Sequence, residues 1–317
     1  MRLSIIIPAK NAERTIAECI YRVFCNKSTE IECIVIVNDS SDKTYEICKR
    51  LTAKYQSLRV LKTDTAGVSS ARNIGLIHAH GELVGFCDAD DLFEKGALDG
   101  ILNDFSIYDA DMIITGFYRA ERKGNMLIKR GEAICGTPRI LSSKAAQLHI
   151  LSDRKVLGSV CNKFYKRKTI FGIDFDTSLT HCEDMLFNMR ILKCKGLKII
   201  LSDRITYNYI FDRNSATNRS ESLFDEQGRL KYFDALAKIE KLYLKDDRIK
   251  LELAAVKTML GIDNFEHCHG DRIKQAQLRG VIARGFPAKI ATAYERRLRT
   301  NARYLCLGLA ILLGIKR

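Results

Sequence analysis

The chain has 317 residues, of which 46% are hydrophobic and 28% charged, so it can form one large domain or two smaller ones and is not wholly disordered. Its eleven cysteines are scattered without a CxxC pair, which argues against a disulfide framework and indicates reduced thiols in the cytosol. The net charge of +14 is uneven, because residues 1–100 carry 13 Lys and Arg against 14 Asp and Glu, whereas residues 284–317 carry 8 against 1. Much of the basic surplus therefore belongs to a C-terminal tail.

Strands and helices alternate along the first 116 residues. Continuous β-branched runs indicate strands covered on both faces, and apolar residues at helical spacing, as at Ile16, Ile20 and Val23, indicate amphipathic helices between them. This alternation predicts a mostly parallel α/β sheet flanked by helices. The predicted strands are Leu3–Ile7, Ile31–Asp39, Leu58–Lys62, Leu83–Cys87 and Asp111–Gly116, and the predicted helices include 16–24, Asp42–Tyr55 and Val68–His80.

The regular alternation ends after about residue 116. The segment Thr180–Leu192 has the pattern of a loop that enters a helix at Glu183, where the helix dipole favours acidic side chains. The polar stretch Tyr207–Ser220 is expected to be a mobile loop, and residues 223–260 have a charged helical pattern. We therefore expect three parts, an α/β domain over residues 1–220, a helical region over residues 221–300, and a tail over residues 301–317.

Three carboxylates, those of Asp88, Asp90 and Asp91, follow the apolar run Leu83–Cys87. Ligands of parallel sheets bind beyond the carboxyl ends of the strands, so this cluster and the segment 38–42 should border one crevice. Mg²⁺ is usually held by one or two carboxylates together with substrate phosphates, which a D-x-D at a strand end would allow. The alternative is a solvated acidic turn that caps the next helix.

Three further groups could serve a ligand in that crevice. Asp39 can accept a hydrogen bond from a base or a ribose, although Asn38–Ser41 is also ordinary turn chemistry. Arg72 can bind a phosphate or a carboxylate through its fork of donors, or it can be a surface arginine. Asp184, beside Glu183, can take a proton from a hydroxyl, or the pair can simply complement a helix dipole.

Two more segments contain residues that could bind a ligand or a metal. Arg213, Ser215 and Arg219 lie in the expected loop, which could close over a pyrophosphate and supply positive charge, or could be a solvated basic loop. The sequence HCHG at 267–270 has two histidines two residues apart and no second pair nearby, so it does not match a zinc site.

The order of these blocks resembles the family 2 glycosyltransferases of the GT-A type. The resemblance covers about residues 1–220 and implies a Rossmann-like enzyme that transfers a sugar from a nucleotide-diphosphate sugar to an acceptor hydroxyl. It also implies Mn²⁺ or Mg²⁺ as cofactor and inversion at the anomeric carbon. The six blocks are SIIIPAKNAERTIAECI, VIVNDSSDKT, GVSSARNIGL, GFCDADDLF, CNKFYKR and CEDMLFNMRIL.

The resemblance implies roles for individual residues. Asp90 is expected to be the main metal ligand, with Asp88 also at the metal and nearer the ribose. Asp184 is expected to be the general base, oriented by Glu183. Lys10 stands where an aromatic residue is common. The expected donor-binding set is Pro8 and Asn11 near the base, Asp39 on the base, commonly uracil, Arg72 near the diphosphate, Asp88 and Asp91, with Arg213 and Arg219 added from the loop.

The last segment has twelve uncharged residues from Tyr304 to Ile315, with basic residues on both sides. A helix of this length would be about 18 Å long, too short for a bilayer core of about 30 Å. The segment is typical of an interfacial anchor on anionic lipid, and the alternative is a helix packed on the protein or on a second subunit. The anchor and the family resemblance together suggest a saccharide or lipid-linked acceptor, cell-surface polysaccharide or lipopolysaccharide synthesis, and a cytoplasmic, peripheral position on the bacterial plasma membrane.

Two other functions compete with this interpretation. A nucleotidyltransferase would also hold a metal in an α/β crevice, but it should have a glycine-rich phosphate loop after its first strand, and PAKNAERT contains no glycine. A nucleic-acid-binding protein is suggested by the pI near 9.3, but such proteins gather basic residues on one face, whereas the predicted crevice is acidic. We therefore expect no nucleic-acid partner, and the sequence leaves the sugar, the acceptor and the oligomeric state open.

Overall fold

The computed structural model describes residues 2–124, 126–133, 136–152, 156, 158–211, 223–265, 268, 271–296, 308 and 311. The chain forms two compact units, Met1–Asp212 and Arg213–Arg317.

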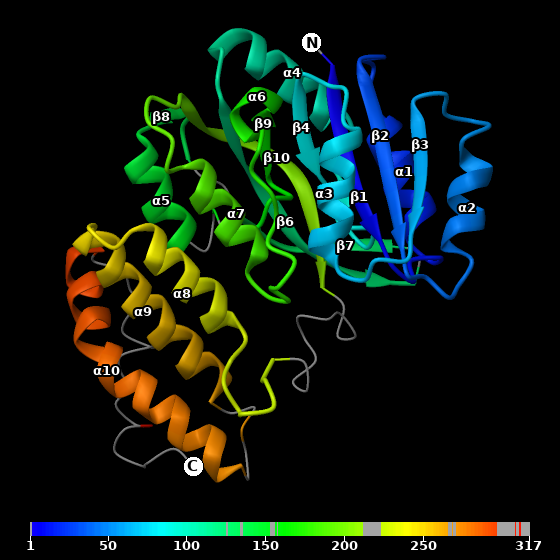
Figure 1. Ribbon diagram of the computed structural model, residues 1–317. Helices are drawn as coiled ribbons and strands as arrows, with labels where there is room; N and C mark the ends of the chain where they lie inside the picture. The colour runs from blue at the N-terminus through cyan, green and yellow to red at the C-terminus, as the bar shows by residue number, and fades with distance from the viewer. Residues whose placement is uncertain are drawn as a thin grey trace. The chain divides into compact units, whose positions relative to one another are not determined.

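The described residues of the first unit form one ten-stranded sheet. Its strands are β1 (Leu3–Ala9), β2 (Ile31–Asn38), β3 (Leu58–Thr63), β4 (Leu83–Phe86), β5 (Leu92–Phe93), β6 (Met112–Lys123), β7 (Met126–Ala133), β8 (Arg139–Leu141), β9 (Lys163–Lys166) and β10 (Ile199–Phe211). Their order is β3-β2-β1-β4-β9-β6-β10-β5, with β7 beside β6 and β8 beside β10 (Figure 1).

Parallel pairing is confined to two parts of this sheet. Strands β1 to β4 are parallel to one another, and β6 is parallel to β10. Strand β9 joins the two parts because it runs antiparallel to both β4 and β6. The predicted α/β class with a central sheet is therefore confirmed, and the second half of the sheet is mixed.

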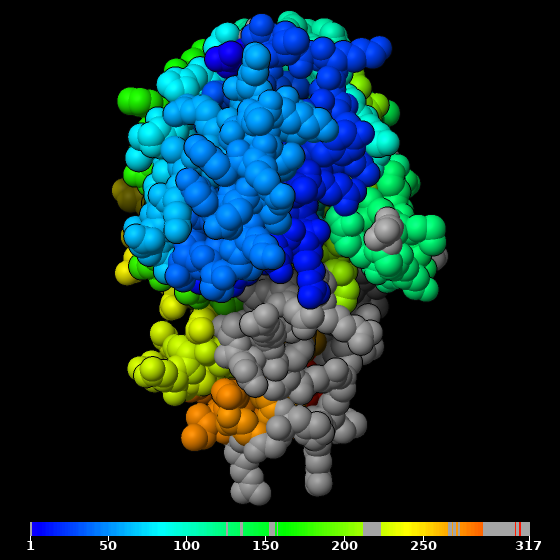
Figure 2. All heavy atoms as spheres, turned by 90° about the vertical axis from the view of Figure 1, so that its right-hand side faces the viewer, coloured from blue at the N-terminus to red at the C-terminus, as the bar shows by residue number. Residues whose placement is uncertain are grey.

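Helices cover both faces of the sheet. They are α1 (Ile16–Phe24), α2 (Thr44–Leu51), α3 (Val68–His78), α4 (Ala97–Tyr108), α5 (Ser143–Ser152), α6 (Arg167–Ile170) and α7 (Glu183–Ile191). In Figure 1, α3 lies in front of the β1–β4 part of the sheet and α1 lies behind it. Helix α1 buries Ile16, Ile20 and Val23, as their spacing predicts. In Figure 2 the first part of the chain, in blue, forms much of the visible surface of the first unit.

Half of the strands were not predicted from the sequence. They are β5, β7, β8, β9 and β10, and residues 207–211 are the end of β10 instead of the start of a mobile loop. Strand β10 is hard to recognise because it contains polar residues that the fold buries, such as Asn208, which β6 and β5 flank on its two sides. Residues 212–222, with Arg213 and Arg219, lie outside the described residues.

The second unit is helical over its described residues. Its helices are α8 (Tyr232–Leu242), α9 (Asp247–Asn264) and α10 (Arg272–Arg296), whereas residues 223–230 form a turn closed by a bridge between Phe224 and Leu230. No helix of the described segments is long and apolar enough to cross a lipid bilayer. The buried core of this unit is Leu223, Phe224, Leu230, Ile262, Phe265, Cys268, Leu278, Ile282 and Ile311.

Two residues of the predicted tail are described, and both pack inside the second unit. Ile311 is 2% exposed and belongs to its core. A side chain at Gly308 would begin only 2.6 Å from the ring of Phe286 and 3.0 Å from Ile262, so the backbone approaches α9 and α10 closely there. The rest of residues 301–317 lies outside the described part of the chain.

Candidate active site

The loops that follow β1 and β2 meet at the carboxyl edge of the sheet. Asn11 and Asp39 both have left-handed backbone conformations, with φ of 50° and 47°, which Asn and Asp tolerate better than other side chains. The Oδ1 atom of Asn11 accepts a hydrogen bond of 2.9 Å from the backbone of Ser41, which joins the two loops. Lys10 forms an ion pair of 2.5 Å with Asp39. A positively charged side chain therefore stands where the family resemblance implies an aromatic one.

The three carboxylates after β4 have three different surroundings. Asp88 is partly exposed and accepts a hydrogen bond of 3.0 Å from Arg72, while Asp90 is exposed in the turn. Asp91 is only 2% exposed and accepts hydrogen bonds from the Tyr207 hydroxyl at 2.8 Å and the Ile210 backbone at 2.7 Å. Burial and the two neighbouring carboxylates raise the pKa of Asp91 well above its usual range.

Arg72 connects this turn to the start of α7. Arg72 is 3% exposed, and its Nη1 donates to Glu183 at 2.8 Å and to Asp184 at 2.6 Å, while Nη2 donates to Asp88. Burial alone would lower the pKa of Arg72, but the three carboxylates outweigh burial and raise it well above the usual value. The guanidinium is therefore permanently charged, and it holds two acidic segments together that are about a hundred residues apart in the sequence.

Asp184 is a largely buried carboxylate at the start of α7. It lies in the first turn of α7, after Cys182, which has a left-handed φ of 58°. Burial and the charges of Glu183 and Asp88 raise the pKa of Asp184 to about 7, although Arg72 and a hydrogen bond from the Val160 backbone at 3.1 Å oppose this rise. A carboxylate with this pKa can accept a proton near neutral pH, which an ordinary exposed aspartate does poorly.

Sequence reasoning missed two buried residues, Asn188 and Lys163, that hydrogen-bond the backbone of Asp184 and of residues 156–159. The side chain of Asn188 donates to the backbone oxygens of Gly158 and Asp184 at 2.8 and 2.9 Å. The ammonium of Lys163 is fully buried and donates to Val156 O at 3.0 Å and Ser159 O at 2.6 Å. Asn188 could have been found because it lies one turn after Asp184 on the same helix face. Lys163 belongs to the block CNKFYKR, but the sequence of this block does not indicate that the lysine is buried.

The carboxylates after β4 fit a shared metal ion. Among the described residues there is no group of three or more His, Cys, Asp or Glu side chains that could hold a metal alone. Mg²⁺ and similar cations commonly take one or two carboxylates and leave the other positions to phosphates and water. The exposed Asp90 and the partly exposed Asp88 provide such a set. The residues present therefore fit a cation that completes its coordination with a ligand's phosphates.

The other predicted donor-binding residues differ in their exposure. Pro8 is buried at the end of β1, Asn11 and Asp39 are exposed, and Asp91 is taken up by Tyr207 and Ile210. Arg72 is bonded to carboxylates in this structure, so its contact with a diphosphate stays a prediction.

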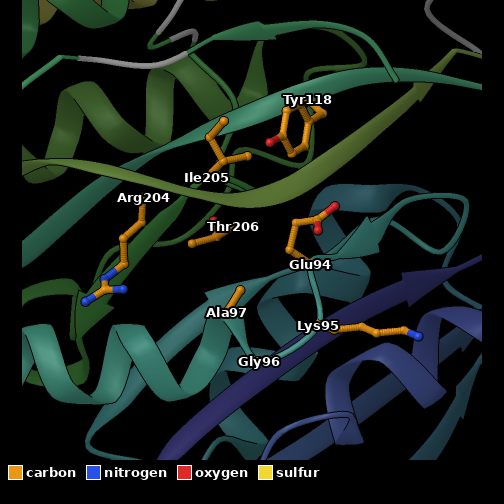
Figure 3. Close-up of a pocket in the computed structure, with 8 residues that line it drawn as sticks. All are labelled: Glu94, Lys95, Gly96, Ala97, Tyr118, Arg204, Ile205 and Thr206. Carbon is orange, nitrogen blue, oxygen red and sulfur yellow. The ribbon is translucent and has the colours of Figure 1, made fainter. Parts of the chain in front are cut away.

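A surface cavity of about 350 Å³ lies between the end of β5 and the strands β6 and β10 (Figure 3). Two of its charged groups have partners, because Glu94 pairs with Lys129 at 2.9 Å and Arg204 pairs with Asp104 at 2.7 Å. No predicted site residue lines it. The residues around it are Glu94, Lys95, Gly96, Ala97, Tyr118, Arg204, Ile205 and Thr206.

Comparison with known proteins identifies the family. Residues 4–173, which contain β2 to β4, all of β1 but its first residue, Arg72 and the Asp88–Asp91 turn, match the model of glycosyl transferase family 2. The chain belongs to this family. The sequence-based prediction of a family 2 glycosyltransferase is thus confirmed, and with it the class of the enzyme as a glycosyl-transferring transferase.

Curated relatives of this family 2 chain include two teichoic acid biosynthesis proteins of Bacillus subtilis. The minor teichoic acid biosynthesis protein GgaB is 29% identical over an alignment of 227 residues, and the match covers 69% of this chain and 24% of GgaB. The protein GgaA is 28% identical over an alignment of 233 residues, and the match covers 68% of this chain and 49% of GgaA. The chain therefore spans about a quarter of one relative and about half of the other.

Solved structures confirm the GT-A-like architecture. The crystal structure of Staphylococcus aureus TarS 1–349 in complex with UDP-GlcNAc has a TM-score of 0.69 at 19% identity, and the match covers 99% of this chain and 92% of that one. The mannosyltransferase PcManGT from Pyrobaculum calidifontis, in complex with GDP-Man and Mn²⁺, has a TM-score of 0.51 at 16% identity and covers 100% of this chain and 88% of that one. At these identities the similarity concerns the fold.

Proposed function

We propose that this family 2 chain transfers a sugar from a UDP-sugar to an acceptor hydroxyl with inversion, with the help of Mn²⁺ or Mg²⁺. The observation that carries this proposal is the bonding of Arg72, which brings Asp88 and Asp184 to the same guanidinium. One of these carboxylates belongs to the turn that fits a metal, and the other has the raised pKa of a base. A metal-binding group and a base beside one another are what sugar transfer from a nucleotide donor needs.

The donor is proposed to lie along the carboxyl edge of β1, β2 and β4. Asp39 would accept a hydrogen bond from the base, and Lys10, which pairs with Asp39, lies beside that contact. Asp90 and Asp88 would hold the cation, which neutralises charge on the leaving diphosphate when it is bound. The complexes of TarS with UDP-GlcNAc and of PcManGT with Mn²⁺ support the nucleotide and the metal by analogy of fold.

Asp184 is proposed to accept the proton of the acceptor hydroxyl. The acceptor oxygen then attacks the anomeric carbon from the face opposite to the diphosphate, the bond between that carbon and the diphosphate oxygen breaks, and the configuration inverts. The pKa of about 7 suits this step, because the carboxylate is both deprotonated in a useful fraction and basic enough to take the proton. Glu183 would orient Asp184 through their shared partner Arg72.

The acceptor is proposed to be a growing cell-surface polymer of the teichoic acid kind, or a lipid-linked precursor of one, at the inner face of the plasma membrane. The names of GgaB and GgaA support this choice. The basic and apolar tail supports contact with a lipid surface, although Ile311 is occupied in the core of the second unit. Arg213 and Arg219 stay candidates for binding the diphosphate.

Calorimetric titration of UDP, with and without Mn²⁺, tests the donor site. We expect Mn²⁺ to tighten UDP binding in the wild type and Asp90→Asn to abolish this gain, because the variant removes the carboxylate that is expected to be the main metal ligand. Asp203→Asn is the matched control, since Asp203 is an exposed carboxylate on β10 that has no role in the proposed site.

Three results would change the proposal. Binding of GDP or CDP in place of UDP would keep the reaction and change the donor. Equal loss of the Mn²⁺ effect in the Asp203→Asn control would mean that the substitution acts on the fold and not on the site. Absence of nucleotide binding by the wild type would refute the proposed function.

A further inference from the structure

Tyr207 is a buried residue of β10 whose hydroxyl group contacts the turn after β4 twice. It is 2% exposed, and its Oη atom accepts a hydrogen bond of 3.1 Å from the backbone N–H of Asp88. The same hydroxyl donates to Oδ2 of Asp91 at 2.8 Å. One phenol therefore touches the first and the last carboxylate residue of the Asp88–Asp91 turn.

Asp91 adds a second attachment of the turn to β10. Its Oδ1 accepts a hydrogen bond of 2.7 Å from the backbone of Ile210, and its own N–H donates to Asp88 O at 3.1 Å, which closes the turn. The strand β5, which follows directly, pairs with β10 in the register of Phe93 opposite Tyr207. The turn is thus attached to β10 in two ways. The side chains of Tyr207 and Asp91 make hydrogen bonds between them, and the backbone of β5, directly after the turn, pairs with β10.

We infer that Tyr207 and Asp91 are positioning residues, which hold the Asp88–Asp91 turn in the conformation that leaves Asp90 exposed for the donor's metal ion. The inference rests on the proposed function. It gives the third carboxylate of the turn a role that differs from donor binding, because both of its oxygens are already engaged inside the protein. It also assigns a function to a residue more than a hundred positions away from the turn.

The physical reason is the narrow geometry that such cations require. Small divalent cations such as Mg²⁺ demand well-placed oxygen ligands, and groups that orient metal ligands typically contribute about 10- to 100-fold to metal affinity or activity. The loss of the Tyr207 hydroxyl would leave the part-buried Asp88 N–H and a buried oxygen of Asp91 without these partners. The turn would then have to rearrange, and Asp90 moves with it.

The test compares two buried tyrosines. Tyr207→Phe removes the hydroxyl on the turn. Tyr165→Phe is the matched control, because the buried Tyr165 hydroxyl also makes a hydrogen bond, of 2.8 Å to Asn188, but does not contact the turn. The measurement is the Mn²⁺ concentration that gives half of the gain in UDP affinity, together with UDP affinity without metal and the melting temperature.

We expect Tyr207→Phe to raise the Mn²⁺ midpoint about 10-fold or more, the size typical of groups that orient a ligand, and to leave metal-free UDP binding unchanged. Asp91→Asn should raise the midpoint in the same direction. Tyr165→Phe should leave it unchanged, even if its melting temperature falls as much as that of Tyr207→Phe.

An unchanged midpoint in both Tyr207→Phe and Asp91→Asn would overturn the inference while the proposed function stands. Equal shifts in the two tyrosine variants would also overturn it, because they would show general loosening. If the wild type itself has no Mn²⁺-dependent UDP binding, the proposed function fails, and the inference fails with it.

Discussion

The two acidic clusters of the first unit look alike in sequence and differ in surroundings. The turn Asp88–Asp91 separates its carboxylates into a partly exposed, an exposed and a buried one, whereas Glu183 and Asp184 are both largely buried and bonded to the same atom of Arg72. Neighbouring carboxylates can therefore differ in exposure when they lie in a turn. Two carboxylates in the first turn of a helix can instead bind the same guanidinium, as Glu183 and Asp184 bind Arg72. Burial, more than sequence position, separates Asp90, the proposed metal ligand, from Asp184, the proposed base.

The largest difference between the clusters should appear on replacing the base. Asp184→Asn keeps an oxygen that can accept from Arg72 but cannot take a proton, so we expect sugar transfer to fall about 10²- to 10⁴-fold. UDP binding with Mn²⁺ should be retained, in contrast to Asp90→Asn. Transfer rates from single-turnover experiments and calorimetric titration measure the two effects. A variant with normal turnover would remove Asp184 from the role of base.

Removing the shared partner should affect both clusters at once. Arg72→Gln leaves several carboxylates close together without their cation, and breaking such a buried ion pair typically costs about 3–5 kcal/mol of folding free energy. Denaturant unfolding measures this cost, and Arg190→Gln is the control, because the more exposed pair of Arg190 with Asp176 should contribute less than about 1 kcal/mol. Equal costs for the two arginines would mean that Arg72 does not join the clusters energetically.

The smallest expected effect is a shift in pH dependence. Since the base must be deprotonated and the pKa of Asp184 is about 7, kcat/KM should rise with pH through the neutral range and level off above it. Glu183 raises this pKa, so Glu183→Gln should move the rising limb to lower pH. Arg72 lowers the pKa, so any active Arg72 variant should move the limb to higher pH.

Measurement of kcat/KM against pH at saturating Mn²⁺ checks these directions. A limb that does not move in Glu183→Gln would indicate that another group controls the profile. A limb that moves to higher pH would contradict the electrostatic coupling between Glu183 and Asp184.

The parallel part of the fold and the carboxylate positions could be predicted from the sequence because they depend on local patterns. Apolar runs such as 31–37 specify buried strands, and the carboxyl ends of parallel strands necessarily lie at one edge. The placement of Asp88 and Asp39 at that edge follows from the same reasoning. Helix α7 could be predicted to begin near Glu183 because acidic residues favour a helix start.

The remaining features depend on contacts between distant segments. Residues 207–211 look like part of a polar loop, but they form a strand that pairs with β6 along its length and with β5 at Tyr207 and Asn208. The burial of Asp91 cannot be read from DADD, since it depends on Tyr207 and Ile210. The bonding of Arg72 to α7 likewise joins residues about 110 positions apart.

Ile311 is buried in the core of the second unit, so it cannot contact a lipid surface while it stays in that core. A lipid surface that draws the segment around Ile311 out of the core must supply at least the free energy that its burial contributes, about 1.5–3 kcal/mol for a side chain of this size. By thermodynamic linkage, a vesicle that binds this segment would lower the stability of α9 and α10, and a ligand that stabilises these helices would weaken vesicle binding. A truncation that removes Gly308 and Ile311 would then leave a cavity beside Ile262 and Phe286 and destabilise the second unit.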